Sequence, residues 1–222
     1  MIVKELIHTE IHSIASDQPA SEALNQINNY NVSGLPVFDI ETGLLLGLLT
    51  QEEAENVSPA TPVGQLALEK SHFIYERQHI FVAARIMFQY EDRILPVLDE
   101  EDKRVKGLIC KKDVQAAIST MLNLAEQGSV IAVEMRQRDF SLSEVVQLIE
   151  TEGAKILGLT VETSGEIEGD IRVSIKLNVK DVSRVTAALR RYEYIVTSET
   201  RDEAHDMDMQ ARAGELLHFL DM

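Results

Sequence analysis

The hydrophobic pattern in the first half of the chain indicates a helix, two strands and a second helix in succession. Apolar residues recur at helical spacing within residues 20–29. Apolar runs follow at residues 34–39 and 44–49, and the second run is almost wholly apolar, which is typical of a strand covered on both faces. Thr50 then opens a predicted helix, with Glu53 at the spacing of a capping box.

This pattern occurs a second time, sixty residues further along the chain. The same succession is predicted at residues 82–90, 94–98, 105–110 and 111–127, with Gly128 as the expected cap of the last helix. Fourteen residues between Val3 and Leu48 are identical to the residues sixty positions later, where chance would give roughly 3. An internal repeat of this kind predicts two copies of one folding unit, with a pseudo-twofold cleft between them.

The last third of the chain carries a different pattern and no third copy. Its predicted order is strand, helix, two strands, helix and strand, at residues 129–135, 141–152, 156–163, 171–179, 181–191 and 194–198. The first of these helices is expected to begin with a capping box of Ser141 and Glu144. The order βαββαβ is that of a ferredoxin-like arrangement. The remaining residues are acidic and end in an apolar stretch that predicts one more helix.

The expected fold class is therefore mixed α/β (α+β), with a pseudo-twofold pair of repeats followed by a ferredoxin-like domain. A length of 222 residues is ample for this organisation. The expected boundaries are residues 1–60 for copy one, 61–127 for copy two, 128–200 for the third domain and 201–222 for the tail.

The net charge limits what the protein can bind, and the cysteine content indicates the cellular compartment. The formal net charge is −16, which argues against binding of nucleic acid or of an anionic membrane surface. The single cysteine excludes an internal disulfide and favours a reducing cytoplasm. The first residues lack the features of a signal peptide, and no apolar run is long enough to span a membrane. We therefore expect a cytoplasmic protein.

The polar side chains do not predict a catalytic or a metal centre. His8 and His12 are four residues apart, and His205 lies close to Asp206 and Asp208, but neither group shows a third ligand with helix support. No nucleophile elbow, phosphate-binding loop or dinucleotide-binding glycine motif is present. We expect no bound metal and no enzymatic activity.

Two motifs in each copy carry a resemblance to a known family. Residues 35–39 read LPVFD and residues 47–53 read GLLTQEE, while their counterparts at 95–99 and 107–113 read LPVLD and GLICKKD. This duplicated combination resembles the cystathionine-β-synthase (CBS) domain, here as a tandem pair that covers residues 1–127. The resemblance implies a regulatory module whose clefts bind adenine nucleotides.

The end of the second motif suits a nucleotide. A hydroxyl at a helix start lies beside unpaired backbone N–H groups and forms a phosphate site, and a carboxylate one turn later can accept hydrogen bonds from a ribose diol. The adenine would lie near the start of the preceding strand. The candidate ligand-binding residues are Asp113, Cys110, Lys111, Lys112, Arg93, Ile94, Leu95 and Pro96 in copy two, and Thr50, Glu53, Gly34, Leu35 and Pro36 in copy one.

The two copies differ at the residues that matter most for this chemistry. Copy one has Thr50 but carries Glu53 where the family has Asp, whereas copy two has Asp113 but carries Cys110 in place of the hydroxyl. The net charge is −8 for copy one and −1 for copy two, so an anionic ligand is expected to prefer copy two. A purely structural interpretation stays open, with Thr50 and Glu53 as a helix cap and Cys110 as a buried apolar residue.

The third domain resembles an ACT domain, a family of small-molecule-binding regulatory modules, by its pattern and by its position after the repeats. Residues 138–142, between its first strand and first helix, contain no glycine. We therefore expect it to serve dimerisation and coupling rather than amino-acid sensing. As a whole, the chain resembles acetoin-utilisation proteins of the AcuB type.

These resemblances imply a non-enzymatic regulatory homodimer that acts on an unknown protein target. Its regulatory ligand would be AMP, ADP, ATP or S-adenosylmethionine, and no further cofactor is expected. The alternative is a ligand-free dimeric interaction scaffold, in which both clefts are closed by their own side chains.

Overall fold

The computed structural model describes residues 1–8, 13–163 and 169–201. The chain divides into two compact units, Met1–Ile118 and Ser119–Met222. The first unit, called unit 1, contains both copies of the repeat, and the second, called unit 2, contains the third domain. The helix predicted in the acidic tail lies outside the described residues.

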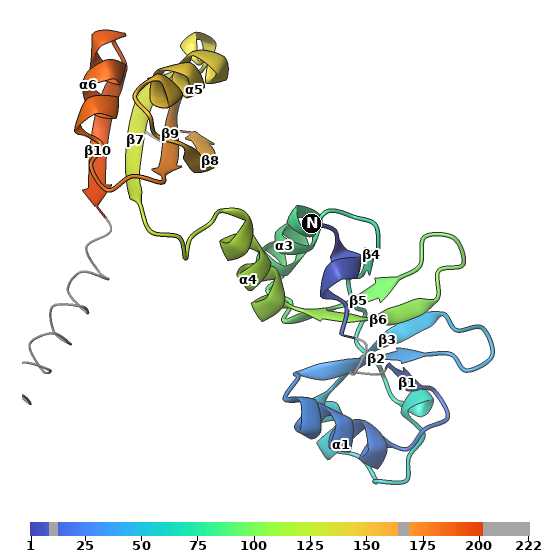
Figure 1. The fold of residues 1–222 in the computed structure, drawn as a ribbon. Helices are drawn as coiled ribbons and strands as arrows, with labels where there is room; N and C mark the ends of the chain where they lie inside the picture. The colour runs from blue at the N-terminus through green and yellow to red at the C-terminus, as the bar shows by residue number, and fades with distance from the viewer. Residues whose placement is uncertain (9–12, 164–168, 202–222) are drawn as a thin grey trace, which may run out of the picture. The chain divides into compact units, whose positions relative to one another are not determined.

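Unit 1 contains two three-stranded sheets, one from each copy of the repeat (Figure 1). Copy one forms η1 (Val3–Leu6), β1 (Ile14–Ala15), α1 (Ala20–Tyr30), β2 (Gly34–Phe38), β3 (Leu45–Thr50) and α2 (Gln51–Glu55). Copy two forms η2 (Val63–Gln65), β4 (Ile74–Tyr75), α3 (Ile80–Gln89), β5 (Ile94–Leu98), β6 (Val105–Cys110) and α4 (Lys111–Met121). The duplicated succession of helix, two strands and helix is confirmed.

The strands of the two copies pair in the same register. In each sheet the first strand runs parallel to the second and the second runs antiparallel to the third, in the orders β1-β2-β3 and β4-β5-β6. Gly34 lies opposite Thr50, and Ile94 lies opposite Cys110. The start of one strand therefore lies beside the end of the next, where the following helix begins.

The leading segment of each copy packs into the core of the other copy. Val3 is fully buried among the apolar residues of copy two, and its N–H donates to the carbonyl of Gln78 at 2.9 Å. Val63 is fully buried in the core of copy one, and its N–H donates to the carbonyl of Gln18 at 2.9 Å. The two copies therefore interlock, and each core contains a residue from the leading segment that the sequence repeat assigns to the other copy.

Helix α4 is shorter than the helix predicted at residues 111–127, which is a correction. Asn123 has a φ of 50°, the left-handed conformation that ends many helices. Its N–H donates to the carbonyl of Thr120, and the N–H of Leu124 donates to that of Ser119, so the last carbonyls are satisfied. The cap is therefore an asparagine in a Schellman motif and not Gly128. The division between units 1 and 2 falls within α4, before the predicted boundary at residue 127.

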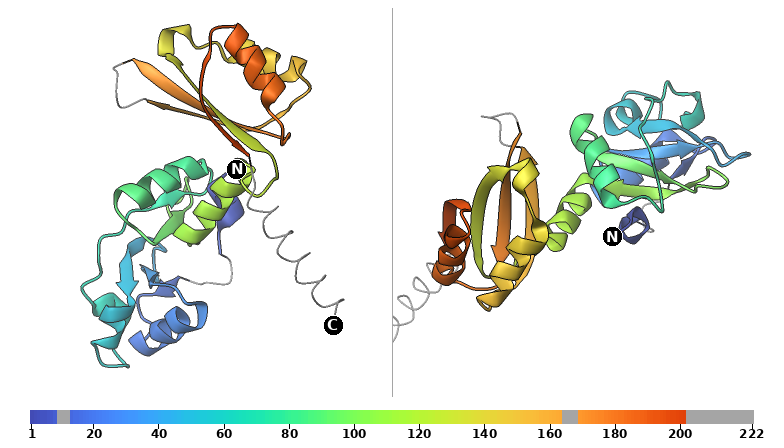
Figure 2. Two further views of the ribbon diagram at one scale, coloured as in Figure 1. Left: turned by 90° about the vertical axis from the view of Figure 1, so that its left-hand side faces the viewer. Right: turned by 90° about the horizontal axis from the view of Figure 1, so that it is seen from above.

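Unit 2 has a four-stranded antiparallel sheet with two helices packed on it (Figure 2). Its elements are β7 (Ser129–Arg136), η3 (Gln137–Asp139), α5 (Leu142–Thr151), β8 (Ile156–Thr163), β9 (Asp170–Leu177), α6 (Ser183–Arg191) and β10 (Ile195–Arg201), with the strand order β10-β7-β9-β8. Every second residue of β9 is buried, so one face of the sheet meets α5 and α6 in the core. The observed succession matches the predicted order βαββαβ.

One predicted cap in unit 2 is wrong. Ser141 and Glu144 have capping-box spacing, but the Ser141 side chain makes no cap hydrogen bond and lies 3.1 Å from the Ser143 hydroxyl oxygen. Glu144 instead accepts a hydrogen bond from the Tyr194 hydroxyl at 2.9 Å, because β10 brings that ring over the helix start. Among the described residues, no helix has the length and apolar character needed to cross a membrane.

Candidate functional site

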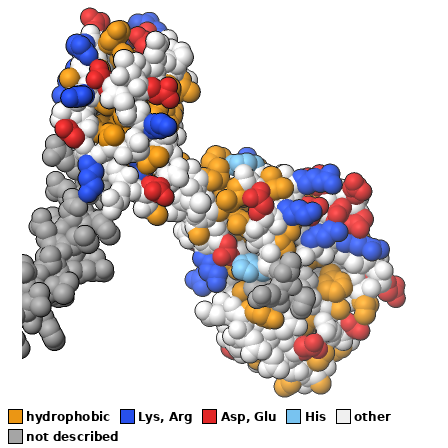
Figure 3. All heavy atoms as spheres, in the orientation of Figure 1, with side chains coloured by type: hydrophobic (Ala, Val, Ile, Leu, Met, Phe, Trp, Pro, Cys, Tyr) orange, Lys and Arg blue, Asp and Glu red, His pale blue; other side chains and the backbone are white. Residues whose placement is uncertain are grey.

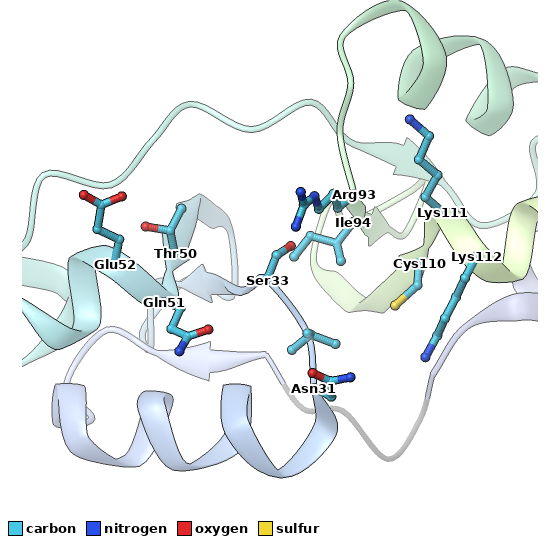
Figure 4. A pocket seen from close by; sticks show the side chains of 11 residues that line it. Asn31, Ser33, Thr50, Gln51, Glu52, Arg93, Ile94, Cys110, Lys111 and Lys112 are labelled. Atoms are coloured by element: carbon cyan, nitrogen blue, oxygen red, sulfur yellow. The ribbon is translucent and has the colours of Figure 1, made fainter.

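A pocket of about 690 Å³ lies between the two copies of the repeat, within unit 1 (Figure 4). Copy one lines it with Asn31, Val32 and Ser33 before β2, and with Thr50, Gln51 and Glu52 where β3 passes into α2. Copy two lines it with Arg93 and Ile94 at the start of β5, and with Cys110, Lys111 and Lys112 where β6 passes into α4. The pocket is therefore built from equivalent junctions of the two copies.

The registers of the two sheets explain why these junctions meet. Strands β2 and β5 each begin beside the end of the antiparallel strand that follows them, so one strand start and one helix start form a single edge in each copy. Ile94 and Cys110 of copy two also belong to the same apolar cluster as Leu35 and Leu49 of copy one. Burial of these side chains holds the two edges against each other.

The two walls of the pocket differ in charge. Gln51 and Glu52 of copy one correspond by repeat to Lys111 and Lys112 of copy two. Arg93 adds a third cation on the copy-two wall, and in Figure 4 its guanidinium extends toward the copy-one side. An anionic group in this pocket would therefore be attracted to the copy-two wall.

The two lysines at the start of α4 have different surroundings. Lys111 Nζ donates to the carbonyl of Met87 at 3.3 Å and lies 5.0 Å from the centroid of the Phe88 ring. Lys112 is exposed, and it extends from the helix start in the opposite direction to Lys111 (Figure 4). Lys112 and Arg93 have no ion-pair partner in the part of the chain that the structure describes, so both can face a ligand.

Other cations of copy two lie on the turn between β5 and β6 or at the start of β6, outside the lining of this pocket. Lys106 Nζ lies 3.0 Å from Asp99 Oδ2, and Lys103 Nζ donates to the carbonyl of Glu100 at 2.6 Å. Figure 3 shows Lys and Arg side chains gathered with acidic ones over this turn. The charge of Lys106 is therefore paired locally, and the Lys103 ammonium is held on the turn by a backbone carbonyl.

Thr50 and Glu53 form a complete capping box at the start of α2. Glu53 Oε2 accepts from the Thr50 N–H and from the Thr50 hydroxyl, both at 2.8 Å, while Thr50 Oγ1 accepts from the Glu53 N–H at 3.3 Å. Thr50 and Glu53 therefore do form the helix cap that was the structural alternative to a ligand site. It commits one oxygen of the Glu53 carboxylate to the helix end.

A second pocket of about 490 Å³ adjoins the first, because Thr50 and Glu52 line both. It belongs to copy one together with the segment that follows α2. Its other lining residues are Glu53, Asn56, Val57, Leu66, Ala67 and Glu69. We call it the copy-one cleft. It offers an apolar wall and three carboxylates, which differs in chemistry from the cationic wall of the shared pocket.

In copy two the counterpart of Glu53 is Asp113, and its carboxylate contacts a histidine. His8 Nε2 lies 2.7 Å from Asp113 Oδ2, and both side chains are partly exposed. Cys110 lies beside this pair; its burial, reinforced by the negative charge of Asp113, raises the pKa of the thiol to about 11. Asp113 does not line the shared pocket.

The predicted site residues therefore fall into three groups. The shared pocket brings together Thr50, Arg93, Ile94, Cys110, Lys111 and Lys112. Glu53 and Asp113 are turned to the copy-one cleft and to His8, respectively. The remaining five are buried in β2 and β5: Gly34, Leu35, Pro36, Leu95 and Pro96.

Sequence reasoning missed several residues of the site. Gln51 and Glu52 could have been found as the repeat counterparts of the two lysines, and Asn31 and Ser33 as neighbours of the strand start. His8 carried no such signal, because its contact with Asp113 spans 105 positions. The other histidine and aspartate groups considered from sequence include His12 and His205, which lie outside the described residues.

Comparison with known proteins identifies the family. The CBS domain model matches residues 3–55 and 63–120, which together make up half of the chain. The chain therefore belongs to the CBS-domain family, as a tandem pair. Pairs of CBS domains are typically regulatory modules that bind adenosine-containing ligands.

Curated relatives and solved structures each match about half of the chain. Inosine-5'-monophosphate dehydrogenase of Aquifex aeolicus is 33% identical over 107 residues, which are 46% of this chain and 21% of that protein. The chain thus spans about a fifth of the length of that enzyme. The CBS domain-containing protein YhcV of Bacillus subtilis is 24% identical over 139 residues, covering 57% of this chain and 96% of that protein. A CBS domain pair/ACT domain protein of Thermotoga maritima is 23% identical with a TM-score of 0.49, covering 54% of this chain and 98% of that chain.

Proposed function

We propose that this chain is a non-catalytic regulatory protein that binds an adenine nucleotide in its CBS pair. One observation carries the proposal: a pocket built from both copies has a cationic wall on one side and adjoins a cleft that is apolar and acidic. A nucleotide has the same two-part character, since its phosphates are anionic and its nucleoside is uncharged.

The phosphates would lie in the shared pocket against copy two. Arg93 and Lys112 would pair with them, and both side chains are exposed and line the pocket. The start of α4, an eleven-residue helix, adds backbone N–H groups on the same wall. This part of the proposal keeps the preference for copy two that the charge balance predicts.

The nucleoside would lie in the copy-one cleft. Val57 and Leu66 provide apolar surface for the base, and the Glu53 carboxylate has one oxygen that the capping box does not use for a ribose hydroxyl. Sequence favours Asp113 for the ribose contact. The hydrogen bond between Asp113 and His8 supports moving that contact to copy one.

Thermal melting of the full chain with a panel of ligands tests the proposal. We expect AMP, ADP or ATP to raise the melting temperature saturably, equivalent to about 2.7 kcal/mol at a hundredfold excess over the dissociation constant. Adenosine should raise it less, because it lacks the phosphates. No shift at millimolar concentration with any of these, or with S-adenosylmethionine, would contradict the proposal and support the ligand-free scaffold instead.

A substitution in the copy-one cleft tests where the nucleoside lies. Ala67 is exposed and lines the cleft, so Ala67→Phe should fill the cleft without disturbing the core. We expect this variant to lose the shift caused by adenosine as well as that caused by the nucleotides. An unchanged adenosine shift in Ala67→Phe would place the nucleoside elsewhere, even with the phosphate assignment intact.

A further inference from the structure

Three potential metal ligands from separate parts of unit 1 converge beside the start of α4. His8 lies after η1, Cys110 ends β6, and Asp113 lies in the first turn of α4. One ligand atom from each residue lies within 4.8 Å of the others. Cys110 is buried, whereas the side chains of His8 and Asp113 are 31% and 27% exposed, so the cluster is open to solvent on one side.

The backbone path that brings His8 to this place is tightly defined. The His8 N–H donates to the carbonyl of Leu108 at 3.1 Å, which seats the leading segment on β6. Gly107 allows the close approach: a Cβ at that position would lie 2.8 Å from Ile7 Cγ2 and 3.2 Å from the His8 carbonyl oxygen. The histidine is therefore held next to Cys110 by a backbone hydrogen bond and by packing on β6.

The same three positions carry no such donor set in copy one. The repeat counterparts of His8, Cys110 and Asp113 are Leu68, Thr50 and Glu53. Leu68 packs against the core of copy one, and the other two form the capping box. The differences at these three positions thus lie at one place in the fold. There, copy two has an imidazole, a thiol and a carboxylate, whereas copy one has an apolar side chain and the two residues of a helix cap.

We propose that His8 Nε2, Cys110 Sγ and Asp113 Oδ2 form a binding site for one divalent transition-metal ion, with Zn²⁺ as the preferred ion. Imidazole, thiolate and carboxylate are the usual ligands of zinc, at about 2.0–2.3 Å, whereas Mg²⁺ and Ca²⁺ select oxygen ligands. Tetrahedral coordination places ligand atoms roughly 3–4 Å apart, so the 2.7 Å contact between His8 and Asp113 needs to open only slightly. The fourth position is left to water or another small ligand.

Binding would replace the proton of the Cys110 thiol, which leaves to solvent as the metal–sulfur bond forms. The ion would then clip the leading segment of the chain to the junction of β6 and α4. The metal site meets the shared pocket only at Cys110, because neither His8 nor Asp113 lines that pocket. Metal binding and nucleotide binding can therefore be tested separately, and either one could be found without the other.

Absorption spectroscopy with Co²⁺ tests the site in the full-length, untagged and reduced protein. Cobalt bound by a thiolate shows a charge-transfer band in the near ultraviolet, and four-coordinate cobalt shows intense visible bands. We expect both to saturate at one ion per chain and to vanish when Zn²⁺ is added. A titration without a charge-transfer band, or one that Mg²⁺ reverses as readily as Zn²⁺, would overturn the proposal.

Matched variants assign the ligands. Cys110→Ser should abolish the charge-transfer band, and His8→Ala and Asp113→Asn should each weaken Zn²⁺ binding at least tenfold in competition with a chromogenic chelator. His72→Ala is the control, because His72 Nδ1 lies 2.9 Å from Asp92 Oδ2 in a similar pair that contains none of the three proposed ligands. Melting curves in chelator verify that each variant folds. Equal loss in His72→Ala, or retained Zn²⁺ affinity in Cys110→Ser, would contradict the assignment.

Discussion

The aspartate that directly follows β2 or β5 in each copy is held as a carboxylate by the turn that comes after it. Asp99 Oδ1 accepts from the backbone N–H of Glu101 at 2.8 Å, and Asp99 Oδ2 pairs with Lys106. The Glu101 hydrogen bond, followed by that from Lys106, lowers the pKa of Asp99 from 3.8 to about 2. The pKa of its counterpart Asp39 is lowered as well, with the backbone and hydroxyl of Thr42 as the main causes.

This shift predicts a specific loss of stability in acid. Because the folded-state pKa of Asp99 lies below the unfolded value, its contribution is complete above about pH 4 and disappears as the pH falls through about 2. We expect Asp99→Asn to unfold at lower urea concentration than the wild type at pH 6, and the two to converge near pH 2. A difference that persists unchanged at pH 2 would show that the carboxylate charge is not the cause.

The Thr50–Glu53 capping box predicts a modest, local effect. Glu53→Ala removes the acceptor of the Thr50 N–H and should cost about 1 kcal/mol of unfolding free energy, measured by urea denaturation. Glu53→Gln retains an acceptor at the same place and should cost less. Equal losses in both variants would mean that charge, and not capping, is what Glu53 contributes.

At the scale of elements, the exchange of leading segments sets how the two copies depend on each other. The side chain of Val3 is fully buried in the core of copy two, and that of Val63 is fully buried in the core of copy one. Each apolar core thus includes a residue that the repeat assigns to the other copy. Each leading segment therefore contributes stability to a sheet other than the one that follows it in the chain.

Paired valine substitutions test this arrangement. Val3→Ala and Val63→Ala should each cost about 1–3 kcal/mol, from lost burial and the cavity left behind. Native-state hydrogen exchange should show faster exchange in β4, β5 and β6 for Val3→Ala, and in β1, β2 and β3 for Val63→Ala. The opposite assignment of the two variants would contradict the interlocked arrangement.

The elements were predictable to different degrees, for physical reasons. The strands and their common register followed from the repeat, because identical apolar patterns with the same turn chemistry fold alike. The exchange of leading segments did not follow, since Val3 and Val63 are equivalent whichever core they enter. The end of α4 at Asn123 was missed because Gly128 offered a more familiar stop signal. For the site, the motif residues were found, whereas His8 depended on a tertiary contact.

At the scale of the whole molecule, we propose that the protein is a homodimer, which CBS pairs and ACT-like sheets both favour. In the same proposal, unit 2 is an ACT-type coupling domain and the protein is located in the cytoplasm. Sedimentation velocity at micromolar concentration should give a species of twice the chain mass of 24.9 kDa. A single species of 24.9 kDa would contradict the dimer.

The central claim is that nucleotide phosphates are bound by the copy-two wall of the shared pocket, and calorimetric titration of matched charge variants tests it most directly. Lys112→Glu and Lys70→Glu change the net charge equally and both replace exposed lysines, but Lys70 lines neither pocket. We predict that Lys112→Glu weakens binding of the tightest nucleotide about tenfold or more, while Lys70→Glu leaves it unchanged. Equal affinity for Lys112→Glu and wild type, or equal weakening in both variants, would contradict the account.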